Sequence, residues 1–135
     1  MTQTDRTIRI AMNGVTGRMG YRQHLGRSIL ARREQGGVAG PDGTRLHVGP
    51  ILVGRNEAKL RHIAQTHGLE EISTDIDTVM TRDDVDVYFD AQTTSRRHQA
   101  LRQAIEAGNH VYTEQPTAGT LDQAIALASL ARRRG

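Results

Sequence analysis

The chain has 135 residues, 36% of them hydrophobic and 24% charged, and its formal net charge is +3. This length and composition are typical of one globular domain that buries its own core. No apolar run approaches the ~20 residues that span a membrane, so we expect no membrane partner. Because the chain has no cysteine, disulfides and thiolate metal sites are excluded, and a cytoplasmic protein is expected.

Charge and aromatic content argue against a nucleic-acid partner. Three tyrosines, one phenylalanine and no tryptophan leave few rings on which bases could stack. The arginines are scattered, except for a run at 132–134 at the end of a predicted helix, where cations interact favourably with the helix dipole. The six histidines show no ligand spacing with carboxylates on one helix face, so no metal site is predicted.

A glycine-rich segment follows the first predicted strand, residues 7–12. It reads Gly14, Val15, Thr16, Gly17, Arg18, Met19, Gly20. Glycines between a strand and a helix let the backbone approach a ligand closely, and the helix start offers free N–H groups to a pyrophosphate. The spacing is G-x-x-G-x-x-G, with Val15 at the usual first glycine of G-x-G-x-x-G. A tight turn without a ligand is therefore the alternative interpretation.

Hydrophobic periodicity along the chain switches repeatedly between strand-like runs and helical spacing. This alternation predicts βαβ units and an α/β fold with a doubly wound parallel sheet of the Rossmann type, as a single domain over residues 1–135. The remaining predicted elements are a helix from the glycines to near Gly36, a turn at 41–43, a strand over 47–53, a helix over 57–67, a weak strand at Ile72, a short helix from Asp75 or Thr78 to near Arg82, a strand over 85–91, a helix from Ser95 to Gly108, a strand over 110–113 and a helix from 121 to about 133.

The end of the second predicted strand reads Val53, Gly54, Arg55, Asn56. In dinucleotide-binding folds an acidic residue here contacts the ribose 2′-hydroxyl, whereas an arginine accommodates a 2′-phosphate. Because no acid is present and Arg55 offers a planar fork of donors, the sequence favours NADP, with NAD as the alternative. Asn56 is also predicted to cap the next helix, and Arg55 could instead be a solvated loop residue.

Two later segments resemble one family. They are Asp84–Thr94 followed by His98, and Ala107-Gly108-Asn109-His110-Val111 leading into Glu114-Gln115-Pro116. This order is similar to that of the glucose-fructose oxidoreductase and inositol dehydrogenase family, written Gfo/Idh/MocA. In that family a strand is followed by a loop that touches the cofactor and by a histidine at the start of the next helix. The sequence A-G-K-H-V then leads into Glu-Lys-Pro. The resemblance extends from Ile8 to the last predicted helix.

The resemblance implies an NAD(P)-dependent oxidoreductase acting on a sugar, a polyol or a related substrate. It implies that the cofactor's pyrophosphate is held by the glycine turn, through Gly14, Thr16, Gly17, Arg18, Met19 and Gly20. It also implies that Thr93, Thr94 and His98 lie along the path to the nicotinamide and that Glu114 lies near the nicotinamide ribose. A capping or surface role is the alternative for His98.

The chain departs from the family pattern in two ways. Gln115 takes the place of the lysine that usually lies beside the reacting carbon, and glutamine cannot exchange a proton near neutral pH. The family's C-terminal substrate domain is also expected to be absent. We therefore expect this chain to be inactive alone, to meet a small-molecule substrate only in a longer parent, and to self-associate if apolar surface is left open.

Two other functions remain as alternatives. The run Gly17, Arg18, Met19, Gly20 is also similar to the loop of dihydrodipicolinate reductases, although that family's later segment is not recognisable. A non-catalytic protein that binds or senses a dinucleotide is the second alternative, and Gln115 is the residue that favours it.

Overall fold

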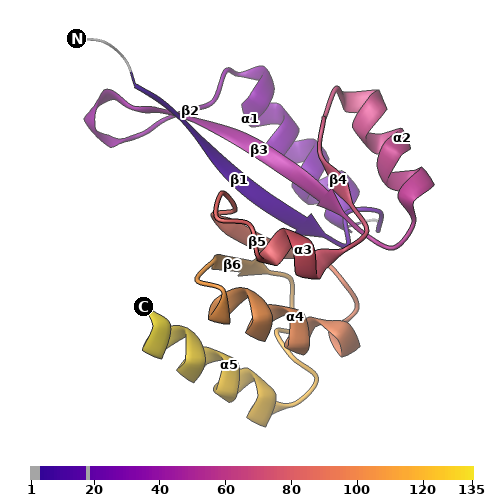
Figure 1. The fold of residues 1–135 in the computed structure, drawn as a ribbon, viewed down its shortest axis with the longest axis vertical. Helices are drawn as coiled ribbons and strands as arrows, with labels where there is room; N and C mark the ends of the chain where they lie inside the picture. Colours follow the sequence, from indigo (N-terminus) through magenta and orange to yellow (C-terminus); the bar gives the residue numbers. More distant parts are fainter. Residues whose placement is uncertain (1–3, 18) are drawn as a thin grey trace.

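The centre of the fold is a six-stranded sheet with the order β2-β3-β1-β5-β6, in which β4 pairs with β3. The computed structural model describes residues 4–17 and 19–135, and of Met19 the backbone alone. All strand pairs are parallel except β2 with β3. The strands are β1 (Asp5–Asn13), β2 (Val38–Ala39), β3 (Arg45–Val53), β4 (Ile72–Ser73), β5 (Val87–Asp90) and β6 (His110–Thr113) (Figure 1).

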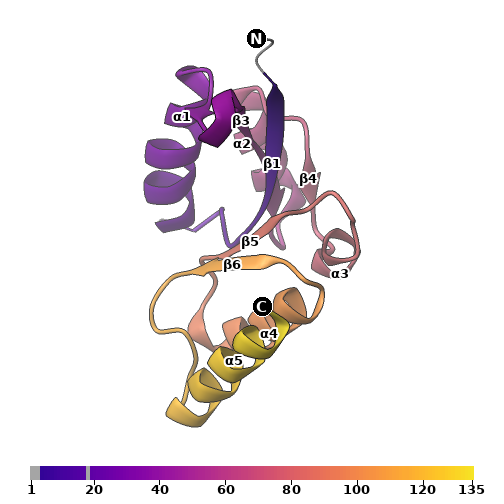
Figure 2. The same cartoon turned by 90° about the vertical axis from the view of Figure 1, so that its left-hand side faces the viewer.

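Helices cover both faces of the sheet. They are η1 (Met19–Leu30), α1 (Ala31–Glu34), the single turn η2 (Pro41–Gly43), α2 (Glu57–His67), α3 (Ile76–Met80), α4 (Thr94–Glu106) and α5 (Leu121–Arg134). Figure 2 shows α4 and α5 together on one side of β5 and β6. Among the described residues, no helix has both the length and the apolar character that crossing a membrane requires.

Alternating side chains of each strand divide the core into two layers. In β1, Ala11 packs with α4 and α5, whereas Met12 packs with η1 and α2. In β5, Tyr88 belongs to the same layer as Ala11, and Phe89 belongs to the same layer as Met12. Successive residues of a strand point to opposite faces, so buried apolar residues on both faces require helices on both sides. The predicted doubly wound α/β fold is confirmed.

The first helix differs from the expected α-helix because η1 is a π-helix along its whole length and continues into α1. Tyr21, Leu25 and Leu30, which are four and five residues apart, all pack into one core layer. The wider π turn keeps positions with this spacing on one face.

The segment before the second predicted strand also differs from a fully parallel sheet. β2 and β3 form an antiparallel hairpin, in which Val38 is opposite Leu46, and β3 begins two residues earlier than predicted. The hairpin closes through Asp42, whose φ is +62°, and Gly43, whose φ is +76°. Elsewhere the boundaries shift slightly: β5 is shorter than predicted, and α4 begins at Thr94 rather than Ser95.

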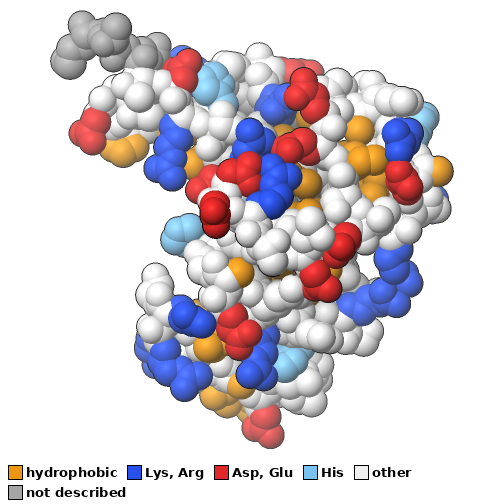
Figure 3. Space-filling model, in the orientation of Figure 1, with side chains coloured by type: hydrophobic (Ala, Val, Ile, Leu, Met, Phe, Trp, Pro, Cys, Tyr) orange, Lys and Arg blue, Asp and Glu red, His pale blue; other side chains and the backbone are white. Residues whose placement is uncertain are grey.

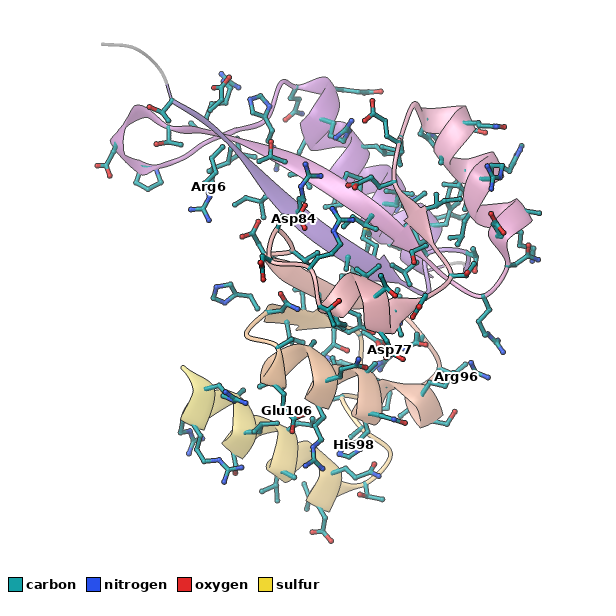
Figure 4. All side chains as sticks on the ribbon, viewed as in Figure 1. Arg6, Asp77, Asp84, Arg96, His98 and Glu106 are labelled. Carbon is teal, nitrogen blue, oxygen red and sulfur yellow. The ribbon has the colours of Figure 1, made fainter. Side chains whose placement is uncertain are left out.

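An ion-pair network covers the surface beside the first half of β1. Arg9 contacts Glu71 at 2.8 Å and Asp84 at 3.1 Å, and Arg82 contacts the same two carboxylates at 3.0 and 2.7 Å. Figure 3 shows basic side chains in blue beside acidic side chains in red near the middle of this face, and Figure 4 labels Asp84 in the same region. The hydrogen bond from Arg82 is the main cause that lowers the pKa of the Asp84 carboxyl. These arginines are therefore matched by acids.

The order of the strands places a topological switch point at the carboxyl end of β1. The chain leaves β1 towards β3 and returns to β5 on the other side of β1. In doubly wound sheets, ligands bind outside the carboxyl ends of the strands at this point of reversal. Asn13, Asp90 and Thr113 end the three adjacent strands β1, β5 and β6 there, so the residues that follow them form the candidate site.

Candidate functional site

Gly14, in the turn after β1, lies between the end of β3 and the residue that follows β5. Its N–H donates to the carbonyl oxygen of Val53 at 3.2 Å. Its φ is +85°, and a Cβ added there would lie 2.6 Å from the carbonyl carbon of Ala91. Both the conformation and the space therefore require glycine at this position.

The other two glycines bring the helix start against the same turn. Gly17 donates to the carbonyl oxygen of Gly14 at 3.1 Å, and the N–H of Tyr21 reaches the carbonyl oxygen of Gly17 at 2.9 Å. A Cβ on Gly20 would lie 2.5 Å from the carbonyl oxygen of Gly14. The three glycines thus form one bare backbone turn at the start of η1, which suits an anion. The predicted contacts of Arg18 and of the Met19 side chain lie outside the described residues.

A pocket at the end of β3 brings Arg55 and Thr16 together. Its lining residues are Thr16, Arg55, Asn56, Glu57 and Lys59. The Asn56 side chain caps α2 by accepting the N–H of Lys59 at 3.1 Å, as the sequence predicted. Among the described residues, neither Arg55 nor Lys59 pairs with a carboxylate, whereas Glu57 pairs with Arg61. Two cations therefore face this pocket without a partner in the described part of the chain.

Lys59 was missed by the sequence analysis as a pocket residue. Arg55 lies just before the helix cap, and Lys59 is the third residue of α2. The signal was available in the sequence, because a residue at the third position of a capped helix stays close to the loop before it.

Behind the glycine turn lies a buried polar cluster at the ends of β1 and β5. The Tyr88 hydroxyl donates to Asp90 Oδ2 at 2.5 Å and accepts from Asn13 Nδ2 at 3.0 Å. Gln92 donates to the same carboxylate through its backbone N–H and its side chain. Burial, followed by the negative charge of Asp90, raises the pKa of the Tyr88 phenol well above its usual range. Tyr88 therefore remains a neutral donor.

Arg97 on α4 ties this cluster to the loop after β6. Its Nε lies 3.1 Å from Asp90 Oδ1, and both side chains are buried. Its Nη atoms donate to the carbonyl oxygens of Gln92 at 2.6 Å and Glu114 at 2.8 Å, and also to that of Pro116. Sequence reasoning missed Arg97, although an arginine seven residues after a strand-end aspartate was a visible signal.

Glu114 and Gln115 differ in their surroundings. The Glu114 carboxylate contacts Nε2 of His24 on η1, and 27% of its side chain is exposed. Gln115 is exposed and is joined to Pro116 by a cis peptide bond. The structure therefore brings Glu114 to the glycine-turn helix, whereas Gln115 faces solvent.

Of the three residues predicted along the path to the nicotinamide, two lie at the start of α4. Thr93 is the N-cap residue, and its hydroxyl lies 3.3 Å from that of Ser95, while Thr94 begins the helix. They lie three and four residues after Asp90, the last residue of β5. His98 lies further along the helix, and Figure 4 shows it below α4, on the side away from β5 and β6. His98 lies four residues after Thr94 on the same helix, about one turn further from its start.

Comparison with known proteins gives the same assignment of fold. A family model described as "Oxidoreductase family, NAD-binding Rossmann fold" matches residues 8–135. A D-xylose dehydrogenase from Paenarthrobacter nicotinovorans is 53% identical over 135 residues. The uncharacterized oxidoreductase YrbE from Bacillus subtilis (strain 168) is 26% identical over 78 residues, 58% of the chain. The matches span 34% and 23% of the length of these two relatives.

Solved structures of oxidoreductases share the fold. The 3-ketoreductase KijD10 from Actinomadura kijaniata, solved with NADP and TDP-benzene, aligns with a TM-score of 0.72 at 21% identity. This alignment covers 96% of the chain and 35% of the reductase. An NAD binding oxidoreductase from Klebsiella pneumoniae aligns with a TM-score of 0.73 at 25% identity, over 96% of the chain and 32% of its own length.

Proposed function

Because the chain belongs to the Gfo/Idh/MocA family of oxidoreductases with an NAD-binding Rossmann fold, we propose that it binds NADP at the carboxyl ends of its strands. The glycine turn carries this proposal. Cβ atoms at Gly14 and Gly20 would lie 2.6 Å from the carbonyl carbon of Ala91 and 2.5 Å from the carbonyl oxygen of Gly14, so glycine is what lets the turn close at the start of η1, where helix N–H groups can bind a pyrophosphate. Arg18 and Met19 belong to the same proposed turn.

We propose that Arg55 and Lys59 bind the cofactor's 2′-phosphate. Both line the pocket that Thr16 joins to the glycine turn, and both lack a carboxylate partner among the described residues. No acid ends β3, and the neighbouring Glu57 is held by Arg61. Two cations beside an anionic ribose phosphate favour NADP over NAD by charge and by hydrogen bonding.

The rest of the cofactor would follow the ends of β5 and β6. We propose that Thr93 and Thr94 contact it mainly through their backbone. We also propose that the Glu114 carboxylate accepts hydrogen bonds from the hydroxyls of the nicotinamide ribose. We also propose that His98 contacts the cofactor from further along α4, with a surface role as the alternative. When bound, the nicotinamide would accept a hydride from the substrate in oxidation and would donate one to it in reduction.

In a longer protein, we propose that this domain serves a dehydrogenase of a sugar, a polyol or a related compound. The relative of 53% identity is a D-xylose dehydrogenase, which supports a sugar. Gln115 can hold a substrate hydroxyl by a hydrogen bond, but it cannot take the proton that alcohol oxidation releases. We therefore propose that the 135-residue chain alone is inactive. We also propose that it is cytoplasmic, in keeping with its lack of cysteine, and that it can form homo-oligomers.

Nucleotide titration tests the cofactor proposal. We expect NADPH to bind more tightly than NADH, and Arg55→Ala and Lys59→Ala each to weaken NADPH by about tenfold with little effect on NADH, since each removes a charged hydrogen bond. Arg102→Ala on α4, whose side chain is exposed and pairs with Glu106, is the matched control. If neither nucleotide binds at millimolar concentration, the proposal is wrong. Equal losses for NADPH and NADH would remove the 2′-phosphate assignment.

A dinucleotide-binding protein without catalysis is the second candidate, and the exposed Gln115 favours it. The decisive variant is Gln115→Lys in a longer protein that contains this domain, assayed for sugar and polyol oxidation. A gain of activity would support a catalytic ancestry with altered proton transfer. Unchanged activity with normal nucleotide affinity would support a binding role.

A further inference from the structure

The side chain of Glu114 is held from an element far away in the sequence. We infer that His24 is a positioning residue, which holds one carboxylate oxygen of Glu114 so that the other meets the nicotinamide ribose. This inference rests on the proposed function. His24 lies on η1, four residues after the last glycine of the turn, and 90 residues before Glu114.

The backbone of Glu114 is fixed without His24. Its N–H donates to the carbonyl oxygen of Asp90 at 3.0 Å, and its own carbonyl oxygen accepts from Arg97 at 2.8 Å. These contacts set where the residue lies, but they do not set the direction of the carboxylate. The direction of the carboxylate is set by His24, whose Nε2 contacts Oε1 of Glu114.

Oε2 of Glu114 has a different environment. Among the described residues, no hydrogen bond or ion pair engages this oxygen. The Glu114 side chain is 27% exposed, so a ligand can reach it. A carboxylate with one oxygen held by the protein and the other exposed is suited to accept hydrogen bonds from the hydroxyls of a sugar ring.

The His24 ring is itself held in place by packing. Its centroid lies 4.6 Å from that of Phe89 and 5.8 Å from that of Tyr112, and 18% of its side chain is exposed. Phe89 and Tyr112 come from β5 and β6, so the ring bridges η1 and the two strands. With the Nε2 proton present, His24 donates to the Glu114 carboxylate. The helix that starts at the pyrophosphate turn thereby orients the group proposed for the other end of the cofactor.

Two variants separate the hydrogen bond of His24 from its packing. His24→Phe keeps a ring between Phe89 and Tyr112 but removes the donor, whereas His24→Gln keeps an N–H donor without the ring. The probes are NADPH and adenosine 2′,5′-bisphosphate, which lacks the nicotinamide ribose. We expect His24→Phe to weaken NADPH about tenfold, as for a hydrogen bond to a charged group, and to leave the bisphosphate unchanged. We expect His24→Gln to restore most of the NADPH affinity.

A double variant tests whether His24 acts through Glu114. If it does, His24→Phe in the Glu114→Ala background has no further effect on NADPH. Additive losses, an unchanged NADPH affinity, or equal losses for both probes would overturn the inference. Thermal unfolding of each variant shows whether it is folded. If the unaltered protein binds neither probe, the proposed function fails as well, whereas normal binding with no His24 effect overturns the positioning role alone.

Discussion

Arg97 and Asp90 form a buried ion pair that joins α4 to the end of β5, with 3.1 Å between Nε and Oδ1. The same guanidinium donates to backbone carbonyls of the loops after β5 and β6. One side chain therefore holds the loop that leads through Thr93 into α4 and the loop that carries Glu114. The arginine is suited to this role because its planar fork presents several donors in a fixed geometry.

Arg97→Met should destabilise the domain strongly. The exposed fraction of Asp90 is 0%, so its carboxylate would lose its partner in a buried place, which costs about 3 to 5 kcal/mol of unfolding free energy. Urea denaturation measures the change. Arg102→Met on the same helix, where the pair with Glu106 is exposed, should cost less than about 1 kcal/mol. Similar losses for the two variants would show that the buried pair contributes little.

Gly14→Ala should damage both folding and nucleotide binding. The added Cβ would meet the backbone of Ala91 at 2.6 Å, and the residue would have to keep a φ of +85°. Gly108→Ala is the matched control, because its φ is +87° but nothing lies within 4 Å of its Cβ position. We expect a cost of about 1 kcal/mol for the control from backbone strain, and more for Gly14→Ala, which adds a steric clash. Denaturation and NADPH titration of both variants check this, and equal effects would contradict the close approach.

Tyr88→Phe should change how stability depends on alkaline pH. Because burial raises the pKa of the folded phenol above its unfolded value of about 10, its contribution is complete below pH 10 and is lost as the pH rises further. Wild-type stability should therefore fall relative to the variant by up to about 1.4 kcal/mol per pH unit above pH 10. Denaturation midpoints between pH 8 and pH 11 measure the difference, in which the other tyrosines cancel. A constant difference would show that Tyr88 titrates normally.

Asn56→Ala should remove the cap of α2. Its side chain accepts the N–H of Lys59 at 3.1 Å, and loss of such a cap costs about 1 kcal/mol. Asn56→Asp keeps an acceptor and should retain stability, although its charge should weaken NADPH binding beside Arg55. Thermal unfolding and nucleotide titration separate the two effects. Equal stability of the alanine and aspartate variants would mean that the cap contributes nothing.

Much of the fold could be predicted from local patterns. The caps at Asn56, Asp75 and Thr120 accept backbone N–H groups as their residue types suggest, because capping needs only residues within one turn. The alternation of strands and helices was also readable, since βαβ units follow from periodicity. The π-helix η1 could not be predicted in this way, because its side chains pack against residues from distant strands and helices.

The family and the three glycines of the turn were determined by the sequence itself, because residue order and the absence of a Cβ are properties of the chain. Only the tertiary structure decided which distant residues meet. His24 reaches Glu114 across 90 positions, and Arg97 spans the loops after β5 and β6. No local pattern records such contacts, because they arise when parallel strands align their carboxyl ends and helices pack across them.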